Sequence, residues 1–227
     1  LRRASASVSA GETLSLYYHP TILSLEPPAP TLIEDCSSYS VWYKPRGLMC
    51  SGTRYGDHHS ITRWVEKYLG RPTFLVHRLD RYTQGLLVLA HTKSCAAHLS
   101  KQFAQRDVTK RYHAFVYGKL SQATTVRNEL AGKTAVSHIK PLQPGPLPGT
   151  THVEVIIDTG RKHQIRQHLA QLNHPVVGDR QYGHDSEHNL QLAAVELSFN
   201  CPDTQARKDF TLPKQFGLEA DIVSGTT

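Results

Sequence analysis

A polar loop between two apolar segments contains the first residues whose types could do chemistry. Asp80 lies within residues 77–85, with Arg78 and Arg81 on either side. Nearby positive charges favour the ionised form of a carboxylate, and an ionised aspartate at the edge of a core could act as a nucleophile or a general base. The charge pattern alone favours a plainer interpretation, a solvated turn whose surface ion pair contributes ~0–1 kcal/mol.

A second run, residues 160–168, follows an apolar segment and is expected to open a helix. It contains Arg161, Lys162, His163 and Arg166 but no acidic residue. Cations in a first helical turn oppose the helix dipole, whereas the free N–H groups there can bind phosphate. The pattern therefore favours an anionic ligand, and the alternative is that long basic side chains simply extend into solvent.

A third candidate is the tyrosine of the run Lys110-Arg-Tyr-His-Ala114. Strand alternation places Tyr112 on the face opposite to Arg111 and His113. A tyrosine in such a position usually belongs to the core. The functional alternatives are a ring that stacks on a base or a hydroxyl that takes part in proton transfer.

Histidines and cysteines do not indicate a metal site. His58 and His59 are adjacent, and His184 and His188 lie in an expected loop, but neither pair has further ligands at a recognised spacing. The four cysteines form no C-x-x-C pair, and a disulfide framework is not expected in a chain of this length. We therefore expect no metal and a reduced, cytoplasmic compartment.

Regular elements must position these candidates. Strands are expected near residues 41–43, 74–76, 86–90, 112–116, 153–157 and 191–199, and helices from Ser60, from Thr92 or Ser94, and after Gly160. Several strands separated by two or three helices are typical of an α+β domain rather than a strict βαβ repeat. Residues 121–150 show no clear pattern.

The chain is expected to divide into three parts. Residues 1–30 form an N-terminal segment whose four prolines between positions 20 and 30 favour an extended linker. A single domain is expected over residues 31–215, followed by a tail at residues 216–227. The first residue is Leu1 and the only methionine is Met49, which is consistent with a trimmed or processed start.

Composition restricts the class of protein. Of 227 residues, 39% are hydrophobic and 20% are charged, which is a globular composition. The formal net charge of +7 indicates an anionic partner, either nucleic acid or an acidic surface. The longest apolar run, Leu86–Ala90, is far shorter than the ~20 residues of a membrane span. No apolar stretch follows Arg3, which argues against an intact secretory signal.

Five motifs, in order along the chain, resemble the RluA-type RNA pseudouridine synthase family. They are Trp42-Tyr-Lys-Pro-Arg-Gly47, His77-Arg-Leu-Asp-Arg-Tyr-Thr-Gln-Gly-Leu-Leu-Val-Leu-Ala90, Lys110-Arg-Tyr-His-Ala114, Gly160-Arg-Lys-His-Gln-Ile-Arg-Gln-His-Leu169, and His174-Pro-Val-Val-Gly-Asp179 with Tyr182-Gly183. The resemblance covers roughly residues 31–215. Tyr43, Gln84 and Lys162 stand where the family often has Asn, Ser and Thr. None of the three falls at the expected chemical centre, and Gln84 and Lys162 are the two expected to alter the fit to RNA.

The resemblance implies an α+β catalytic fold, with a mixed, mainly antiparallel sheet flanked by helices around a central active-site cleft. It implies a cofactor-free isomerisation of uridine in RNA, in which the uracil turns over and its C5 joins the ribose C1′. By the same resemblance, Asp80 is the essential carboxylate, Arg166 pairs with it, and Tyr112 stacks on the target base and helps to remove the C5 proton. Whether Asp80 attacks the ribose or removes a ribose proton stays open.

The basic residues of these motifs are expected to contact RNA. They are Arg78, Arg81, Lys110, Arg161, Lys162 and His163. The family modifies both tRNA and rRNA, and the choice between them stays open; a monomer is the default expectation. One alternative function is a non-catalytic RNA-binding or ribosome assembly factor with the same fold. Another is a hydrolytic enzyme on nucleotides that uses Asp80 with Arg166.

Overall fold

A computed structural model describes residues 7, 9–13, 15, 26–52, 59–184 and 187–218. The strands are β1 (Thr31–Asp35), β2 (Tyr39–Lys44), β3 (Phe74–Leu75), β4 (Gln84–Ala90), β5 (Thr109–Tyr117), β6 (Thr124–Leu130), β7 (Lys133–Pro144), β8 (Thr150–Ile157), β9 (Leu192–Asn200) and β10 (Arg207–Thr211). The helices are α2 (Ile61–Leu69), α3 (Lys93–Gln105), α4 (Gln164–Gln171) and the short 3-10 helix η1 (Lys214–Phe216). The expected strands and helix starts are confirmed.

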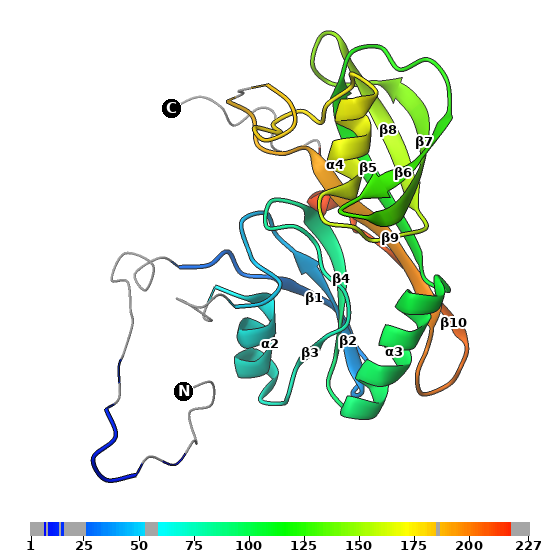
Figure 1. The fold of residues 1–227 in the computed structure, drawn as a ribbon. Helices are drawn as coiled ribbons and strands as arrows, with labels where there is room; N and C mark the ends of the chain where they lie inside the picture. Colours follow the sequence, from blue (N-terminus) through cyan, green and yellow to red (C-terminus); the bar gives the residue numbers. More distant parts are fainter. Residues whose placement is uncertain are drawn as a thin grey trace.

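All ten strands belong to one sheet in the order β1-β2-β4-β9-β5-β8-β7-β6, with β10 beside β9 and β3 beside β4. Among the strands of the described residues, only β4 and β9 pair in parallel, at Gln84–Ala193 and Gly85–Ala194. Figure 1 shows β1 to β4 in one part of the molecule and β6 to β8 in the other, with β9 running between them. The predicted α+β fold with a mixed, mainly antiparallel sheet is confirmed.

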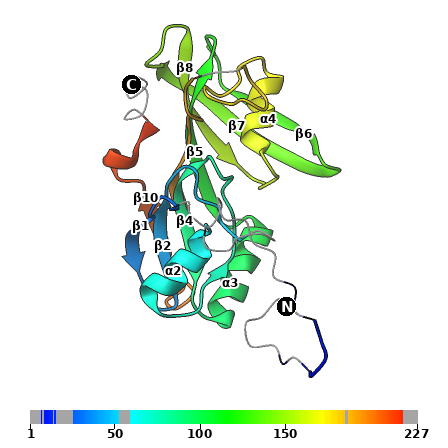
Figure 2. The same ribbon diagram turned by 90° about the vertical axis from the view of Figure 1, so that its left-hand side faces the viewer.

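Helices flank both parts of this sheet. Helices α2 and α3 lie beside the part built from β1 to β4, while α4 lies beside β7 (Figure 2). Helix α2 begins because the Ser60 side chain accepts a hydrogen bond from the Arg63 N–H, and it ends at Gly70 in the left-handed conformation. Thr92 begins α3 in the same way, through Cys95.

The core lies on the two faces of the sheet. Along β4, Leu87 and Leu89 pack in one cluster, which also contains Tyr112. Leu86 and Val88 pack in the other cluster. Burial on both faces explains why β4 is a continuous apolar run rather than an alternating one.

Residues 121–150, whose pattern was unclear, form β6 and β7 and the loop that leads into β8. Along β6, half-buried residues alternate with exposed ones, and every exposed residue is polar, as expected at a sheet edge. Pro141 lies in β7 next to a β-bulge, because proline cannot donate to the hydrogen-bond ladder. Prolines and polar residues therefore hid these strands from a pattern search.

Two expectations concern residues that the structure covers only in part. Strand β1 begins at Thr31, but most of residues 1–30 and residues 219–227 lie outside the described residues, so the three-part division stays a prediction. His58 also lies outside them. No helix in the described ranges is long and apolar enough to span a membrane.

Candidate active site

Asp80 lies in the loop between β3 and β4, where backbone contacts fix its position. The Asp80 carbonyl accepts from Thr83 N–H at 3.1 Å, and the next carbonyl, that of Arg81, accepts from Gly47 N–H at 2.9 Å. Beyond the loop, a Cβ at Gly85 would lie 2.2 Å from the Ala194 carbonyl oxygen. Only glycine therefore allows β4 to pair with β9 beside the Asp80 loop.

A buried lysine ties this loop to the preceding turn. Lys44 has no exposed surface, and its Nζ donates to the carbonyls of Leu48 at 2.7 Å, Pro45 at 3.1 Å and Arg81 at 3.1 Å. Burial lowers the pKa of Lys44 to about 8, against the opposing attraction of Cys50 and Asp80. Sequence patterns marked Lys44 only as part of a motif and did not show this role.

Arg166 differs from its expected pairing. Its Nε and Nη2 donate to the two carboxylate oxygens of Asp179, each at 2.7 Å. Asp80 and Arg166 are both described, and they form no ion pair with each other; the ion-pair contact of Asp80 is with His163. The predicted Arg166–Asp80 pair is therefore wrong for this structure, because the turn at Asp179 supplies a fully buried carboxylate.

The Arg166–Asp179 pair is well satisfied. Asp179 Oδ1 also accepts the backbone N–H groups of Gln181 at 3.0 Å and Tyr182 at 3.1 Å. Burial lowers the pKa of Arg166, but the hydrogen bonds and charge of Asp179 outweigh it and raise the pKa, with a smaller contribution from Asp80. Arg166 is thus a permanent cation near Asp80, held in place by a different carboxylate.

His163 contacts both Asp80 and Tyr182. It adopts the left-handed conformation with φ 54° just before α4, which is uncommon for residues other than glycine, although histidine adopts it more often than most. Its Nδ1 lies 3.0 Å from the Tyr182 hydroxyl, and its Nε2 lies 3.8 Å from Asp80 Oδ1. Burial, followed by the charges of Arg166 and Lys162, lowers the pKa of His163 against the opposing pull of the two aspartates.

Tyr112 faces the Asp80 side of the sheet, as strand alternation predicts, and is 7% exposed. Arg111 points to the opposite side, where it pairs with Glu154 and Glu196. Burial raises the pKa of Tyr112 well above its ordinary range, and the charge of Asp80 raises it further. The Tyr112 hydroxyl therefore stays protonated near neutral pH.

Two cavities meet at Asp80, and both are lined by Asp80, His163 and Arg166. The inner cavity, of about 120 Å³, is further lined by Thr83, Tyr112, Ile157, Ile165 and Leu192, with Arg78, Arg161 and Lys162 around it. The outer cavity, of about 350 Å³, is further lined by Arg81, Tyr82, Gly178, Arg180, Gln181, His188, Asn189 and Leu190. Both cavities are lined by apolar and polar residues, and one carboxylate, Asp80, lines both.

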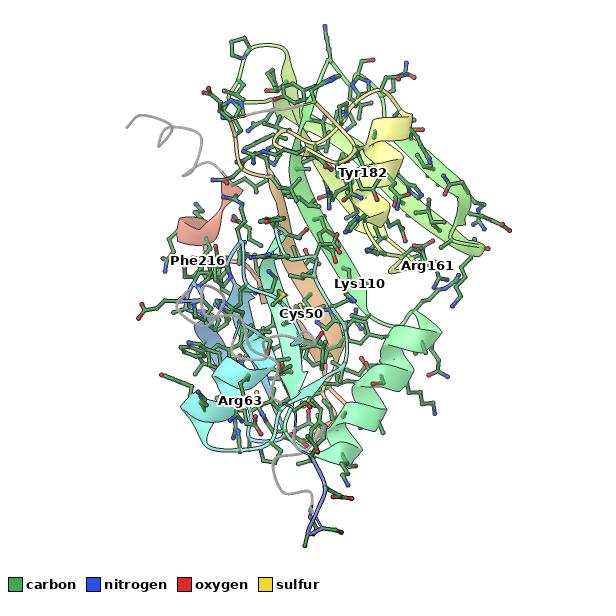
Figure 3. All side chains as sticks on the ribbon, turned by 60° about the vertical axis from the view of Figure 1, so that its left-hand side comes forward. Cys50, Arg63, Lys110, Arg161, Tyr182 and Phe216 are labelled. Atoms are coloured by element: carbon green, nitrogen blue, oxygen red, sulfur yellow. The ribbon has the colours of Figure 1, made fainter. Side chains whose placement is uncertain are left out.

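The residues expected to contact RNA divide between these cavities. Arg78 and Lys162 are exposed beside the inner cavity, whereas Arg81 lines the outer one. Lys110 is largely buried and lines neither cavity. Figure 3 shows Lys110 near Arg161, below Tyr182. Burial lowers the pKa of Lys110, with Asp158 opposing and the nearby arginines adding to the effect.

Functional residues that sequence patterns missed are Lys44, Asp179 and Tyr182. Each lies inside a motif that was recognised, but no spacing rule showed its partner. Among the described residues, no group of three or more histidine, cysteine or acidic side chains is arranged to hold a metal ion. The pair His184 and His188 therefore forms no such group with its described neighbours.

Comparisons with known proteins agree with this geometry. Residues 38–171 match the family model described as RNA pseudouridylate synthase. The chain is 31% identical over 199 residues to tRNA pseudouridine synthase C of Vibrio cholerae, covering 71% of this chain and 82% of the relative. It is 32% identical over 204 residues to the dual-specificity RNA pseudouridine synthase RluA of Vibrio parahaemolyticus, covering 78% and 80%.

The fold is also similar to a solved structure, that of human RNA pseudouridylate synthase domain containing 1. The two agree with a TM-score of 0.71 at 23% identity, over 85% of this chain and 87% of the other. With the family model spanning more than half of the chain and an aspartate at the centre of the cavities, the chain belongs to the RluA-type RNA pseudouridine synthases.

Proposed function

We propose that this protein isomerises uridine in RNA to pseudouridine with Asp80 as the essential carboxylate. The observation that carries the proposal is the position of Asp80 in a cavity whose lining combines apolar side chains with cations. The apolar side chains Tyr112, Ile157 and Leu192 suit a uracil ring, and the cations suit the RNA phosphates around it. Family membership supports the same reaction.

In this proposal the target nucleotide turns out of its stack, at a cost of a few kcal/mol. Its uracil enters the inner cavity, where Tyr112, Ile157 and Leu192 replace the lost stacking contacts. Arg78 is exposed beside this cavity, where its side chain can fill the space that the base leaves. The arrangement brings the ribose C1′ to Asp80.

Asp80 then acts on the ribose, either by attack of a carboxylate oxygen on C1′ or by removal of a ribose proton. Both routes need the ionised carboxylate and break the bond between N1 and C1′. The uracil turns within the cavity and a bond forms between C5 and C1′. C5 loses a proton and N1 gains one, so the reaction balances as an isomerisation.

In the same proposal, Tyr112 removes the C5 proton. Because its hydroxyl is protonated at rest, it accepts that proton only as it passes its own to an acceptor. The Asp80 carboxylate, which lines the same cavity, is the acceptor that we propose. Tyr112 thus combines base stacking with proton transfer.

The substrate class that we propose is structured RNA in the cytoplasm. One similar relative is named for tRNA, and another is named a dual-specificity RNA enzyme. We propose tRNA first and rRNA second, with Arg78, Arg161 and Lys162 as the phosphate contacts beside the inner cavity and a monomer as the working unit.

The test is release of tritium from uridine labelled at C5 in tRNA and rRNA taken from cells that lack the protein. The wild type is expected to release tritium, and Asp80→Asn to lose activity by on the order of 10³-fold or more. Asp209→Asn, an exposed position on β10, is the matched control and should retain wild-type activity. Equal release by wild type and Asp80→Asn contradicts the role of Asp80.

The same assay separates the alternative functions. RNA binding that survives Asp80→Asn, without pseudouridine from any variant, indicates an RNA-binding or assembly factor. Free uracil in the wild-type reaction indicates hydrolysis of the glycosidic bond. Tritium release with no free uracil indicates the isomerase.

A further inference from the structure

The outer cavity is larger than a single uracil requires. Its volume of about 350 Å³ falls at the lower end of the range of small-molecule sites, whereas the inner cavity of about 120 Å³ is far below it. Part of its wall is backbone that only glycine permits, because a Cβ at Gly178 would lie 2.1 Å from the Asn189 carbonyl oxygen. The cavity is thus a formed feature of the fold.

Tyr82 gives this cavity an aromatic surface. It is one of only three large apolar side chains that are exposed in the described part of the chain, at 51%. Tyr68, another of the three, stacks on Trp64 with ring centroids 4.9 Å apart. The contact found for Tyr82 is instead with the Arg81 guanidinium, 5.4 Å from its ring centroid. Exposed aromatic rings beside cations are the platforms on which single-stranded bases stack.

Cations also line the outer cavity. Arg81 and Arg180 are both exposed and lie in its wall. Asp80 is the only carboxylate among the described residues that line it, and Arg166 in the same wall is already paired with Asp179. The wall therefore carries an excess of positive charge, which attracts phosphate.

The two cavities are neighbours that share three lining residues, Asp80, His163 and Arg166. A uridine with its base in the inner cavity and its ribose at Asp80 directs its phosphodiester chain toward the outer cavity. The nucleotide that reaches the outer cavity is then the direct neighbour of the target.

We propose that the outer cavity binds the nucleotide adjacent to the target uridine, with its base stacked on Tyr82 and its phosphate between Arg81 and Arg180. This inference rests on the proposed function, because it takes the target to be a uridine within an RNA strand. It makes Tyr82 a determinant of RNA affinity that is separate from the chemistry at Asp80.

The binding test uses Asp80→Asn protein and two labelled probes, a hexauridylate and a hexamer in which one uridine is flanked by abasic nucleotides. Adding Tyr82→Ala is expected to weaken hexauridylate binding about tenfold, the order of one lost base–aromatic stack. Tyr82→Phe keeps the ring and should bind as the parent does. With the abasic hexamer, Tyr82→Ala should make less than a twofold difference.

Two further variants test the phosphate contact and the specificity of the Tyr82 effect. Arg180→Gln is expected to reduce the slope of log affinity against log salt by about 0.7, the contribution of one phosphate on a single strand. Tyr68→Ala, which removes an exposed tyrosine of α2, should leave the affinity for both probes unchanged.

The proposal is overturned if Tyr82→Ala binds hexauridylate as tightly as the parent, or if the loss is the same with the abasic hexamer. Binding is read in the absence of turnover, so these results do not depend on the isomerase assay. If Tyr82→Ala weakens hexauridylate binding as expected but the wild type releases no tritium, the nucleotide site is supported and the proposed isomerase function is contradicted.

Discussion

The two faces of the central sheet carry cavities of unlike character, although β5 contributes to both. On the front face, that of Asp80, Tyr112 lines the inner cavity of about 120 Å³. On the back face, Arg111, His113 and Phe115 line a cavity of about 640 Å³. Volume alone would place the active site on the back.

Pairing of charges separates the two faces. On the back, Arg111 lies between Glu154 at 2.6 Å and Glu196 at 3.0 Å. On the front, Asp80 meets His163 at 3.8 Å, which is longer than a hydrogen bond. Charges that satisfy each other build structure, whereas a carboxylate with room for a substrate is available for reaction.

The strongest test of this contrast compares neighbouring residues of β5. Tyr112→Phe keeps the ring and removes the hydroxyl, so we expect the rate of tritium release to fall by about 10²- to 10⁴-fold. His113→Phe changes the back face and should keep the rate within about twofold. Similar losses from both substitutions would show that β5 acts only through folding.

The second test compares two carboxylates that each pair with an arginine. Asp179→Ala leaves the Arg166 guanidinium buried and unpaired, and we expect unfolding free energy to fall by about 3–5 kcal/mol. Glu196→Ala leaves Arg111 with Glu154 at a half-exposed site and should cost about 0–1 kcal/mol. Urea denaturation measures both, and equal losses would contradict the contrast between a buried and an exposed pair.

The third test concerns stability at acid pH, which the back face should control. Burial, with a smaller effect of His113, lowers the pKa of His152 to about 4. In the unfolded chain His152 is protonated below about pH 6.5, whereas in the folded protein it stays neutral until the pH approaches 4. The contribution of His152 to stability is therefore complete above pH 6.5 and falls as the pH drops toward 4. His152→Gln should reduce this loss by roughly 1–3 kcal/mol, allowing for its partial exposure.

Its control is Ser94→Ala at an exposed position of α3, which removes no titratable group and should leave the pH dependence of unfolding unchanged. Equal slopes for wild type and His152→Gln between pH 6.5 and pH 4 would show that His152 does not contribute to acid denaturation.

The smallest expected effect is on the front face, through His163. Its pKa lies below the ordinary value, so the ring is neutral near pH 7 and becomes cationic only at lower pH. The cation would then pair with Asp80 and restrain the carboxylate. The charged groups around the ring are Asp80, Lys162, Arg166 and Asp179.

We therefore expect the rate of the wild type to fall only at a pH below the ordinary histidine pKa of about 6.5, and His163→Gln to flatten that acid limb by a few-fold. Tritium release measured from pH 5 to pH 8 checks this. An acid limb of the same shape in both proteins would assign it to another group.

Local patterns predicted the elements that place Asp80 and Tyr112. Ser60 and Thr92 have side chains that can cap the start of a helix, and each begins one. Alternation along β5 correctly placed Tyr112 and Arg111 on opposite faces of the strand. These features depend on residues close in sequence, so a pattern search finds them.

The Arg166 pairing could not be predicted in the same way. Asp80 and Asp179 were both available carboxylates in recognised motifs, and the choice between them depends on the turn where Asp179 also binds two backbone N–H groups. Lys44 was missed for a similar reason, because the carbonyls that it binds come from two separate loops. Partner choice among charges is set by tertiary structure.

The central claim is that Asp80 converts specific uridines of cellular RNA to pseudouridine. The direct measurement is a pseudouridine map of total RNA from cells that lack the protein, complemented with wild type or with Asp80→Asn. We predict one or more sites that are lost without the protein, restored by the wild type and not restored by Asp80→Asn at equal abundance. Restoration of those sites by Asp80→Asn, or identical maps in all cells, would contradict the account.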